Sequence, residues 1–366
     1  MRSAHRHPRP QTSVRGLVLG VLAPALAFLV LAACDQSHMT EPGLETEALQ
    51  AGPVPVSQAA VVEVIARHEG EHYVFDLSDE VVPAGWTTFE LDNHSASTHF
   101  VYLAQVPEPL TTMFQGDRDG MLDYWYENLT RPFQWFMDGM IPGKDQNTDD
   151  LSEVYETLFP HWFEDAIPSG GPGFTGGFLS SRTTVNLNPG YYIIECYVKD
   201  ANGDFHSYNG MLTLLKVTGD APSRTGEPRS SMEIRLATGE LEVPESVRPG
   251  LHTVAVHFDE QPVGGYDHLL GHDVHLVRLD GGWDAESTAE WMNWMDPAGL
   301  VSASGVRGPA TFMGGAQTMM AGQTAYITVR LEPGEYAWVS EVPAGEGMWE
   351  TFTVPHGNST GTGGNH

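Results

Sequence analysis

Short runs of alternating apolar and polar residues occupy the chain from about residue 59 to residue 355. In the clearest run, residues 191–198, Tyr192, Ile194 and Cys196 fall on one face of a strand and Glu195 falls on the other. The 40 glycines and 25 prolines separate such runs, and aromatic and β-branched residues gather within them. The pattern predicts an all-β protein in which Cys196 faces the core near the end of a strand.

Parts of this pattern repeat along the chain. The segment Leu187–Val198 (LNPGYYIIECYV) resembles Leu331–Val342 (LEPGEYAWVSEV), which places Ser340 opposite Cys196, and the pentapeptide HFVYL at 99–103 resembles HLVRL at 275–279. Repeated segments of this kind indicate a duplicated folding unit. We therefore predict two related β-sandwich domains, at 59–220 and 232–355, joined by a linker at 221–231.

The first domain is longer because of an insertion at about 107–170. Residues 121–127 and 151–159 within it have helical patterns, with Asp150 as a possible N-cap. The insertion is rich in Met, Trp and Phe. We expect these side chains to pack against the sandwich, and a ligand pocket or a soft copper-capture surface is the alternative.

The first 33 residues contain four arginines and no acidic residue, and they are apolar from Gly16 to Ala33. The ending Leu31-Ala-Ala-Cys34 resembles the lipobox of bacterial lipoproteins. The resemblance implies a signal peptide at 1–33, lipidation of Cys34, a tether at 34–58, and an exported protein that faces the periplasm or the cell exterior. Membrane contact would then be through the lipid only, and an uncleaved membrane anchor is the alternative. Residues 356–366 are expected to form a disordered tail.

The chain is strongly acidic, with a formal net charge of −30. Removal of the four arginines of the signal peptide would bring that charge to −34. Such a surface disfavours nucleic acid and anionic lipid as partners. It would attract a cationic redox protein, although solubility alone also accounts for it.

The candidate chemistry lies around the two cysteines of the chain, Cys34 and Cys196. If Cys34 is lipidated, Cys196 has no intramolecular disulfide partner. His206 and Met211 follow Cys196, and His99 ends the polar loop Asn93-His-Ser-Ala-Ser-Thr-His. Thiolate, imidazole and thioether groups suit copper. A buried core thiol without a metal is the alternative interpretation.

These residues resemble the cupredoxins, the plastocyanin and azurin family of Greek-key β-sandwiches. The order of His99, then Cys196, His206 and Met211 after a Pro-Gly-x-Tyr turn, matches the family pattern. The resemblance implies one mononuclear copper ion held by these four residues, a role in electron transfer or copper carriage, and a partner protein for redox or copper exchange. The chain departs from the family in its nine residues between Cys196 and His206.

The extra residues contain Asn202-Gly203, a signal for a tight turn. We expect this segment to close as a hairpin and return His206 to the site, because loop closure costs only about 0.6 kcal/mol more per doubling of length.

Other functions fit the sequence less well. A metal-free duplicated β-sandwich that serves as a periplasmic or surface protein- or ligand-binding module is the main alternative. Two-domain copper oxidases use His-x-His pairs for additional copper sites, and residues 35–366 contain none, so we do not expect an enzyme. The second domain has Ser340 in place of the thiolate and is not expected to hold blue copper. Its histidine-rich run Asp267–His275 could bind zinc or copper, but exposed loop residues and one strand histidine are the simpler interpretation.

Overall fold

The computed structural model describes residues 59–70, 72–140, 151–220, 225–244, 246–262, 271–279, 283–302, 310–341 and 348–356. The predicted signal peptide, Cys34, the tether, the proposed Asp150 cap, residues 267–270 and nearly all of the tail lie outside this part of the chain. Within it, no helix combines the length and apolar character that crossing a bilayer requires.

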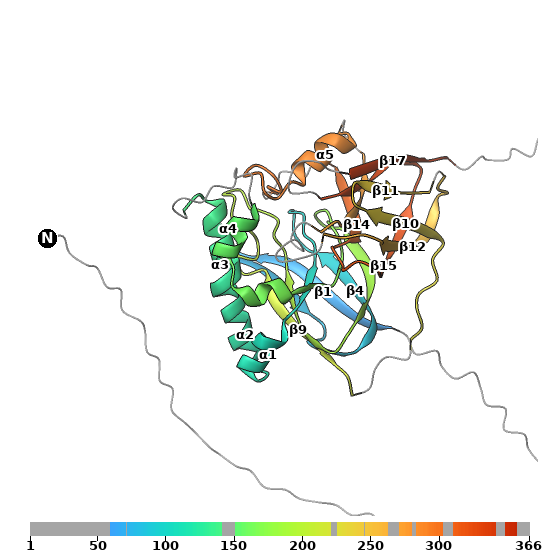
Figure 1. Cartoon of the computed structure of the whole chain (residues 1–366). Helices are drawn as coiled ribbons and strands as arrows, with labels where there is room; N and C mark the ends of the chain where they lie inside the picture. The colour runs from blue at the N-terminus through green and yellow to red at the C-terminus, as the bar shows by residue number, and fades with distance from the viewer. Residues whose placement is uncertain are drawn as a thin grey trace, which may run out of the picture. The chain divides into compact units, whose positions relative to one another are not determined.

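The first sandwich is built from two groups of hydrogen-bonded strands (Figure 1). The first group, in the spatial order β7-β4-β1-β2, consists of β1 (Ala60–Glu69), β2 (His72–Leu77), β4 (Gly85–Asn93) and β7 (Ser180–Leu187). The second is a five-stranded sheet in the order β3-β9-β8-β5-β6, formed by β3 (Val81–Pro83), β5 (Tyr102–Gln105), β6 (Ile167–Pro168), β8 (Gly190–Glu195) and β9 (Leu212–Thr218).

The second sandwich repeats this plan with later strands. Its first group, in the order β11-β10-β12-β15, consists of β10 (Met232–Ala237), β11 (Glu240–Glu242), β12 (Gly250–Phe258) and β15 (Gln323–Leu331). Its second is a four-stranded sheet in the order β14-β13-β16-β17, formed by β13 (Val274–Arg278), β14 (Thr311–Ala316), β16 (Gly334–Ser340) and β17 (Met348–Val354).

Strand pairing confirms the predicted duplication of the β-sandwich. Strand β1 pairs antiparallel with β2 and parallel with β4, and β4 pairs antiparallel with β7. Strands β10, β11, β12 and β15 pair in the same way. The two sandwiches also share a sheet, because Tyr326–Thr328 of β15 pair with Arg182–Thr184 of β7 to give eight continuous strands.

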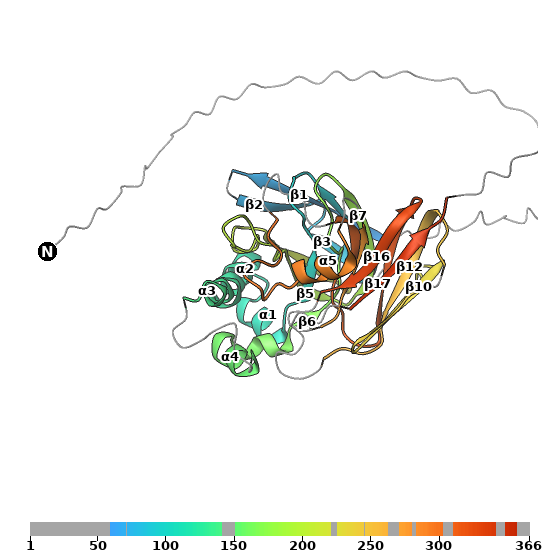
Figure 2. The ribbon, with the colours of Figure 1, turned by 90° about the horizontal axis from the view of Figure 1, so that it is seen from above.

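The insertion in the first sandwich is helical, as predicted. It contains α1 (Glu108–Phe114), α2 (Arg118–Trp125), a π-helical turn (Tyr126–Thr130), α3 (Arg131–Met137), α4 (Leu151–Leu158) and a 3₁₀ turn (His161–Asp165). These helices gather beside the first sandwich in both views (Figures 1 and 2). Many of the Met, Trp and Phe side chains are buried there, with Met121 and Trp125 fully enclosed, whereas Met113 and Met140 are exposed.

The helical insertion changes the surroundings of β8. Ile194 and Cys196 are buried, as the alternation predicts, but Ile193 on the opposite face is fully buried too. Glu195 lies on that opposite face, as predicted, but it is only half-exposed there. Its side chain faces a cavity whose other walls include Leu129 and Phe133 of the insertion. A strand covered on both faces gives an alternation that cannot reveal which polar residues reach water.

Candidate metal centre

Three of the four predicted ligands converge in the core of the first sandwich. His99 Nδ1 and His206 Nδ1 lie 3.1 Å apart, and Cys196 Sγ lies 3.8 Å from each of them. All three side chains are completely buried. The fold therefore brings Cys196 and His206, which lie 97 and 107 residues after His99 in the chain, to one point, where two imidazole nitrogens and one sulfur form a compact group.

The loop before His99 fixes the orientation of its ring. The Asn93 side chain donates hydrogen bonds to the carbonyl oxygens of Ser97, Thr175 and Gly176, which stabilises the loop. The Ser95 hydroxyl donates to Asn93 Oδ1, so its oxygen is available to accept the N–H of His99 Nε2, 2.8 Å away. With the hydrogen on Nε2, the Nδ1 lone pair of His99 faces Cys196 and His206.

The nine residues between Cys196 and His206 form the predicted hairpin. Lys199 and Phe205 pair as an antiparallel bridge, and the Asp200 side chain accepts the N–H groups of Asn202 and Asp204 at the turn. The N–H of His206 then donates to the carbonyl of Val198 at 2.8 Å. The excursion closes on itself and places His206 beside Cys196, so the long spacing does not separate the ligands.

The fourth predicted ligand, Met211, is held between two of the others by its backbone. Its N–H donates to the carbonyl of His206 at 2.8 Å, and its carbonyl accepts the N–H of Cys196 at 3.3 Å. Its side chain is fully buried. Met211 thus completes a buried His–Cys–His–Met cluster, in the order that the sequence predicted.

Two residues that the sequence analysis did not select cover this cluster from the β1–β2 hairpin. The ring of Tyr73 stacks on His206 with their centroids 3.8 Å apart and a 17° angle between their planes. The ring of His68 lies edge-on to His99 at 5.6 Å. Val62, Val64 and Ala66 form a buried alternating stripe that His68 continues, so the period of β1 was a usable signal for its inward direction.

Burial determines the protonation states of the metal-free ligands. It lowers the pKa of His99 to about 3 and the pKa of His206 well below 6.5, because an imidazolium ion would lose its hydration there. It raises the pKa of the Cys196 thiol to about 12. Near pH 7 both imidazoles are therefore neutral and the thiol keeps its proton. A metal ion that takes up the thiolate would have to displace that proton.

The donor set fits a copper ion. Two imidazole nitrogens and a thiolate sulfur, with a thioether nearby, are the ligands of blue-copper centres. In His206, Nδ1 is the nitrogen that faces Cys196, so Nδ1 is the atom that would bind the ion. The Nε2 atom of His206, on the other side of the ring, is buried and has no hydrogen-bond partner. Structural zinc sites use four strong ligands, commonly thiolates and imidazoles, and the described residues supply three here.

The corresponding place in the second sandwich holds a different buried group. Asp273, His275 and Glu341 approach one another within 4.8 Å. His275 Nδ1 accepts the N–H of Phe174 at 3.1 Å, and its Nε2 lies 2.8 Å from Asp273 Oδ2. A neutral ring that accepts at Nδ1 carries its hydrogen on Nε2 and offers no lone pair to a metal ion there. The group is therefore a paired imidazole and carboxylate, beside a second buried carboxyl group.

Comparisons with known proteins give similarity in structure only. No protein-family model matches the chain, and no curated protein matches it in sequence. Auracyanin from Roseiflexus castenholzii is 15% identical, with 44% of this chain and 98% of that chain covered and a TM-score of 0.22. Auracyanin A from Chloroflexus aurantiacus, a "blue" copper protein, is 14% identical, with 44% and 100% covered and a TM-score of 0.24. The blue copper oxidase from Nitrosomonas europaea is 11% identical, with 81% and 86% covered and a TM-score of 0.22.

Identities and TM-scores this low assign no function, so strand pairing and site geometry must support any conclusion. Both observations agree for the first sandwich. The paired strands end in loops that bring His99, Cys196, His206 and Met211 together inside the core. The chain has a cupredoxin-like fold with a buried His–Cys–His–Met cluster of the kind that suits a type 1 copper ion.

Proposed function

We propose that this chain is an exported, lipid-anchored protein that binds one copper ion in its first sandwich and transfers single electrons. The convergence of His99 Nδ1, His206 Nδ1 and Cys196 Sγ within 4 Å, all completely buried, is the observation that supports this proposal most strongly. When bound to such a donor set, copper supplies a one-electron couple between Cu(II) and Cu(I).

The surrounding residues hold the ligands in one arrangement. Asn93 and Ser95 fix the loop and the ring of His99, the hairpin at 199–205 fixes His206, and Tyr73 stacks on the His206 ring. Rigid ligands suit electron transfer, because the protein then reorganises little when the charge of the site changes.

Burial favours electron transfer over copper carriage. An electron can cross the covering Tyr73 and His68 rings without any movement of the protein. Release of the ion would require the β1–β2 hairpin to open, since the ligands have no exposed surface. We therefore expect slow loss of copper to a chelator and rapid, reversible reduction by a small reductant such as ascorbate.

The site is tested by adding Cu(II) to the purified full-length protein in detergent. We expect one equivalent to bind and to give an intense visible thiolate-to-copper band, together with the release of one proton from the Cys196 thiol. The Cys196→Ser variant should lose this band. Absence of stoichiometric binding, or a band that survives in Cys196→Ser, would show that the site is not a copper–thiolate centre.

The second cysteine provides a matched control and tests the anchor. Cys34→Ser should keep the visible band but lose the incorporation of a labelled fatty acid when the protein is expressed in a bacterium. Cys196→Ser should do the reverse. A Cys34→Ser protein that still incorporates the fatty acid would refute lipidation at Cys34 without affecting the conclusion on copper.

A further inference from the structure

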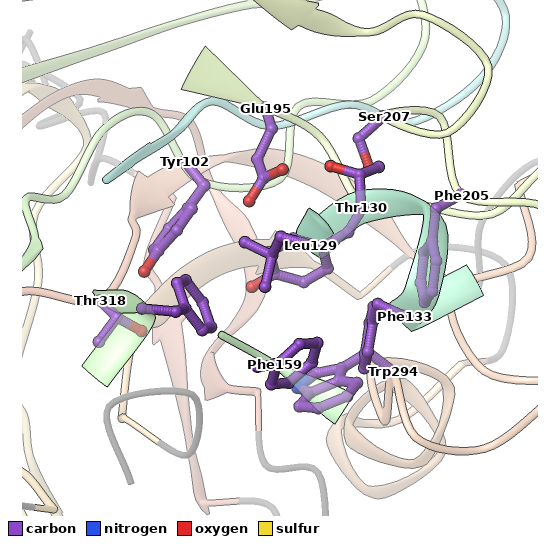
Figure 3. A pocket seen from close by; sticks show the side chains of 12 residues that line it. Tyr102, Leu129, Thr130, Phe133, Phe159, Glu195, Phe205, Ser207, Trp294 and Thr318 are labelled. Carbon is purple, nitrogen blue, oxygen red and sulfur yellow. The ribbon is translucent and has the colours of Figure 1, made fainter. Parts of the chain in front are cut away.

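A cavity of about 80 Å³ lies on the other side of strand β8 from the metal ligands. Three parts of the fold line this partly open cavity: the helical insertion, the segment around Glu195 and Tyr197, and loops of the second sandwich (Figure 3). Its lining includes Glu195, Thr130, Leu129, Phe133, Phe159 and Trp294. Neither the copper proposal nor the strand packing accounts for it.

The cavity contains one carboxyl group and no basic side chain. Figure 3 shows the Glu195 carboxyl group directed into the space, with Tyr102 to one side and Thr130 and Ser207 to the other. None of the lining residues that the structure describes is Lys, Arg or His. Thr130 is 94% buried, and its hydroxyl oxygen has no hydrogen-bond partner. The π-helical turn at 126–130 is what places Leu129 and Thr130 on this wall.

Aromatic rings form the wall opposite Glu195. The Phe133 ring stacks on Phe205 with centroids 5.2 Å apart and lies 5.3 Å from the Trp294 ring. The Phe159 ring lies 5.9 Å from Phe133. Ring faces carry partial negative charge and attract organic cations, most strongly when water is excluded. The Lys199 ammonium group already lies 5.4 Å from the Phe205 ring centroid, so the other three rings are the part of the wall left for a ligand. These rings and the Glu195 carboxyl group both favour a cationic occupant.

The size of the cavity limits that occupant. An apolar protein cavity of about 150 Å³ accommodates benzene. A cavity of about half that volume suits a molecule smaller than benzene, with roughly three or four non-hydrogen atoms. The net charge of −30 also raises the concentration of small cations near the protein.

We propose that this cavity is a binding site for a small alkylammonium cation, which pairs its charge with Glu195 and packs its alkyl groups against the aromatic wall. The ammonium N–H group donates to the carboxylate or to the Thr130 hydroxyl oxygen. Binding does not depend on copper, so the site goes beyond the proposed electron transfer and is testable in the metal-free protein.

The test is a ligand-observed NMR titration of copper-free, full-length protein with trimethylammonium chloride at about pH 8.5, where both the carboxyl group of Glu195 and the probe carry their charges. The neutral probe 2-propanol is the matched control, because it has the same number of non-hydrogen atoms and a similar branched shape. We expect trimethylammonium to bind at least about tenfold more tightly than 2-propanol, a factor that corresponds to about 1.4 kcal/mol. Equal binding of the two probes would show a cavity with no preference for a cation, and no binding of trimethylammonium would leave a cavity that holds water only. Either result would overturn the proposal.

Three variants locate the binding. Glu195→Gln keeps the shape of the side chain and should weaken trimethylammonium binding about tenfold or more. Leu129→Phe keeps every charge, fills the cavity and should have the same effect. Glu240→Gln removes an exposed acidic group on β11 and should change nothing. Circular dichroism verifies that each variant is folded. Binding that survives in Leu129→Phe would be attraction to the acidic surface and would overturn the assignment.

Discussion

Acid should destabilise the copper-free protein through its buried ligand histidines, and one substitution isolates the effect. Burial lowers the pKa of His99 from 6.5 to about 3. Between these pH values the unfolded chain binds a proton at this position and the folded protein does not. The unfolding free energy therefore has its full value, as far as His99 is concerned, above pH 6.5 and decreases as the pH falls toward 3.

The magnitude follows from the two pKa values. Each pH unit inside this window costs about 1.4 kcal/mol of unfolding free energy per histidine. Between pH 7.5 and pH 4.5 we expect His99 to lower the unfolding free energy by about 2.5 kcal/mol. Most of this loss accumulates over the two pH units below 6.5, because pH 4.5 still lies well above the folded-state pKa of about 3. A folded-state pKa one unit higher would change this value by only about 0.1 kcal/mol, because pH 4.5 would still lie above it.

Buried carboxyl groups act in the opposite direction, so the pH profile of the wild type alone is not a test. Burial raises the pKa of Glu195 to about 7, and burial together with Asp273 raises the pKa of Glu341 well above 4.5. Protonation of these groups stabilises the folded protein as the pH falls. The difference in stability between the wild type and a His99 variant cancels their contribution.

The assay is urea denaturation of wild-type and His99→Gln protein from pH 7.5 to pH 4.5, with a chelator present to exclude metal. The unfolding free energy of the wild type minus that of the variant should fall by about 2.5 kcal/mol over this range. His99→Leu should give the same slope, because the slope belongs to the histidine that both variants lack. A difference that does not depend on pH would refute the inference that His99 is neutral and buried in the copper-free protein.

Three further predictions follow from the same contacts. Tyr73→Ala removes the half-buried ring stacked on His206 and should cost about 2 kcal/mol in urea denaturation; faster copper loss to a chelator should accompany it, and an unchanged rate would contradict a covering role. Asn93→Ala leaves three carbonyl oxygens without their donor and should cost about 3 kcal/mol or more in the same assay; a cost below 1 kcal/mol would show that the loop holds without it. Glu341→Gln should raise the melting temperature at pH 8 more than at pH 5. The raised pKa of Glu341 means that the wild type loses stability as the pH rises above 4.5, and the variant does not. An equal effect at both pH values would show that the pKa of this carboxyl group is not raised.

Much of the fold could be predicted because it depends on local patterns. Alternation along residues 191–198 located a strand with Cys196 inward, and the Pro-Gly turns marked where strands begin. Asn202-Gly203 predicted a hairpin that closes in the structure. These features come from interactions between residues close in the chain, which is why the sequence reveals them. The boundaries of the two domains stay a prediction, and the shared pairing of β15 with β7 joins the two sandwiches across them.

Other features depend on which surfaces meet, and only the tertiary structure decided them. The alternation placed Glu195 opposite Cys196 but could not show that the insertion covers part of that face, so that the half-buried carboxyl group lines a cavity. Tyr73 stacks on His206 although the two are far apart in sequence. The residue types and their order along the chain determined the candidate ligands His99, Cys196, His206 and Met211. Long-range packing determined their convergence, their burial and hence their protonation, because desolvation depends on everything that surrounds a group and not on its neighbours in the chain.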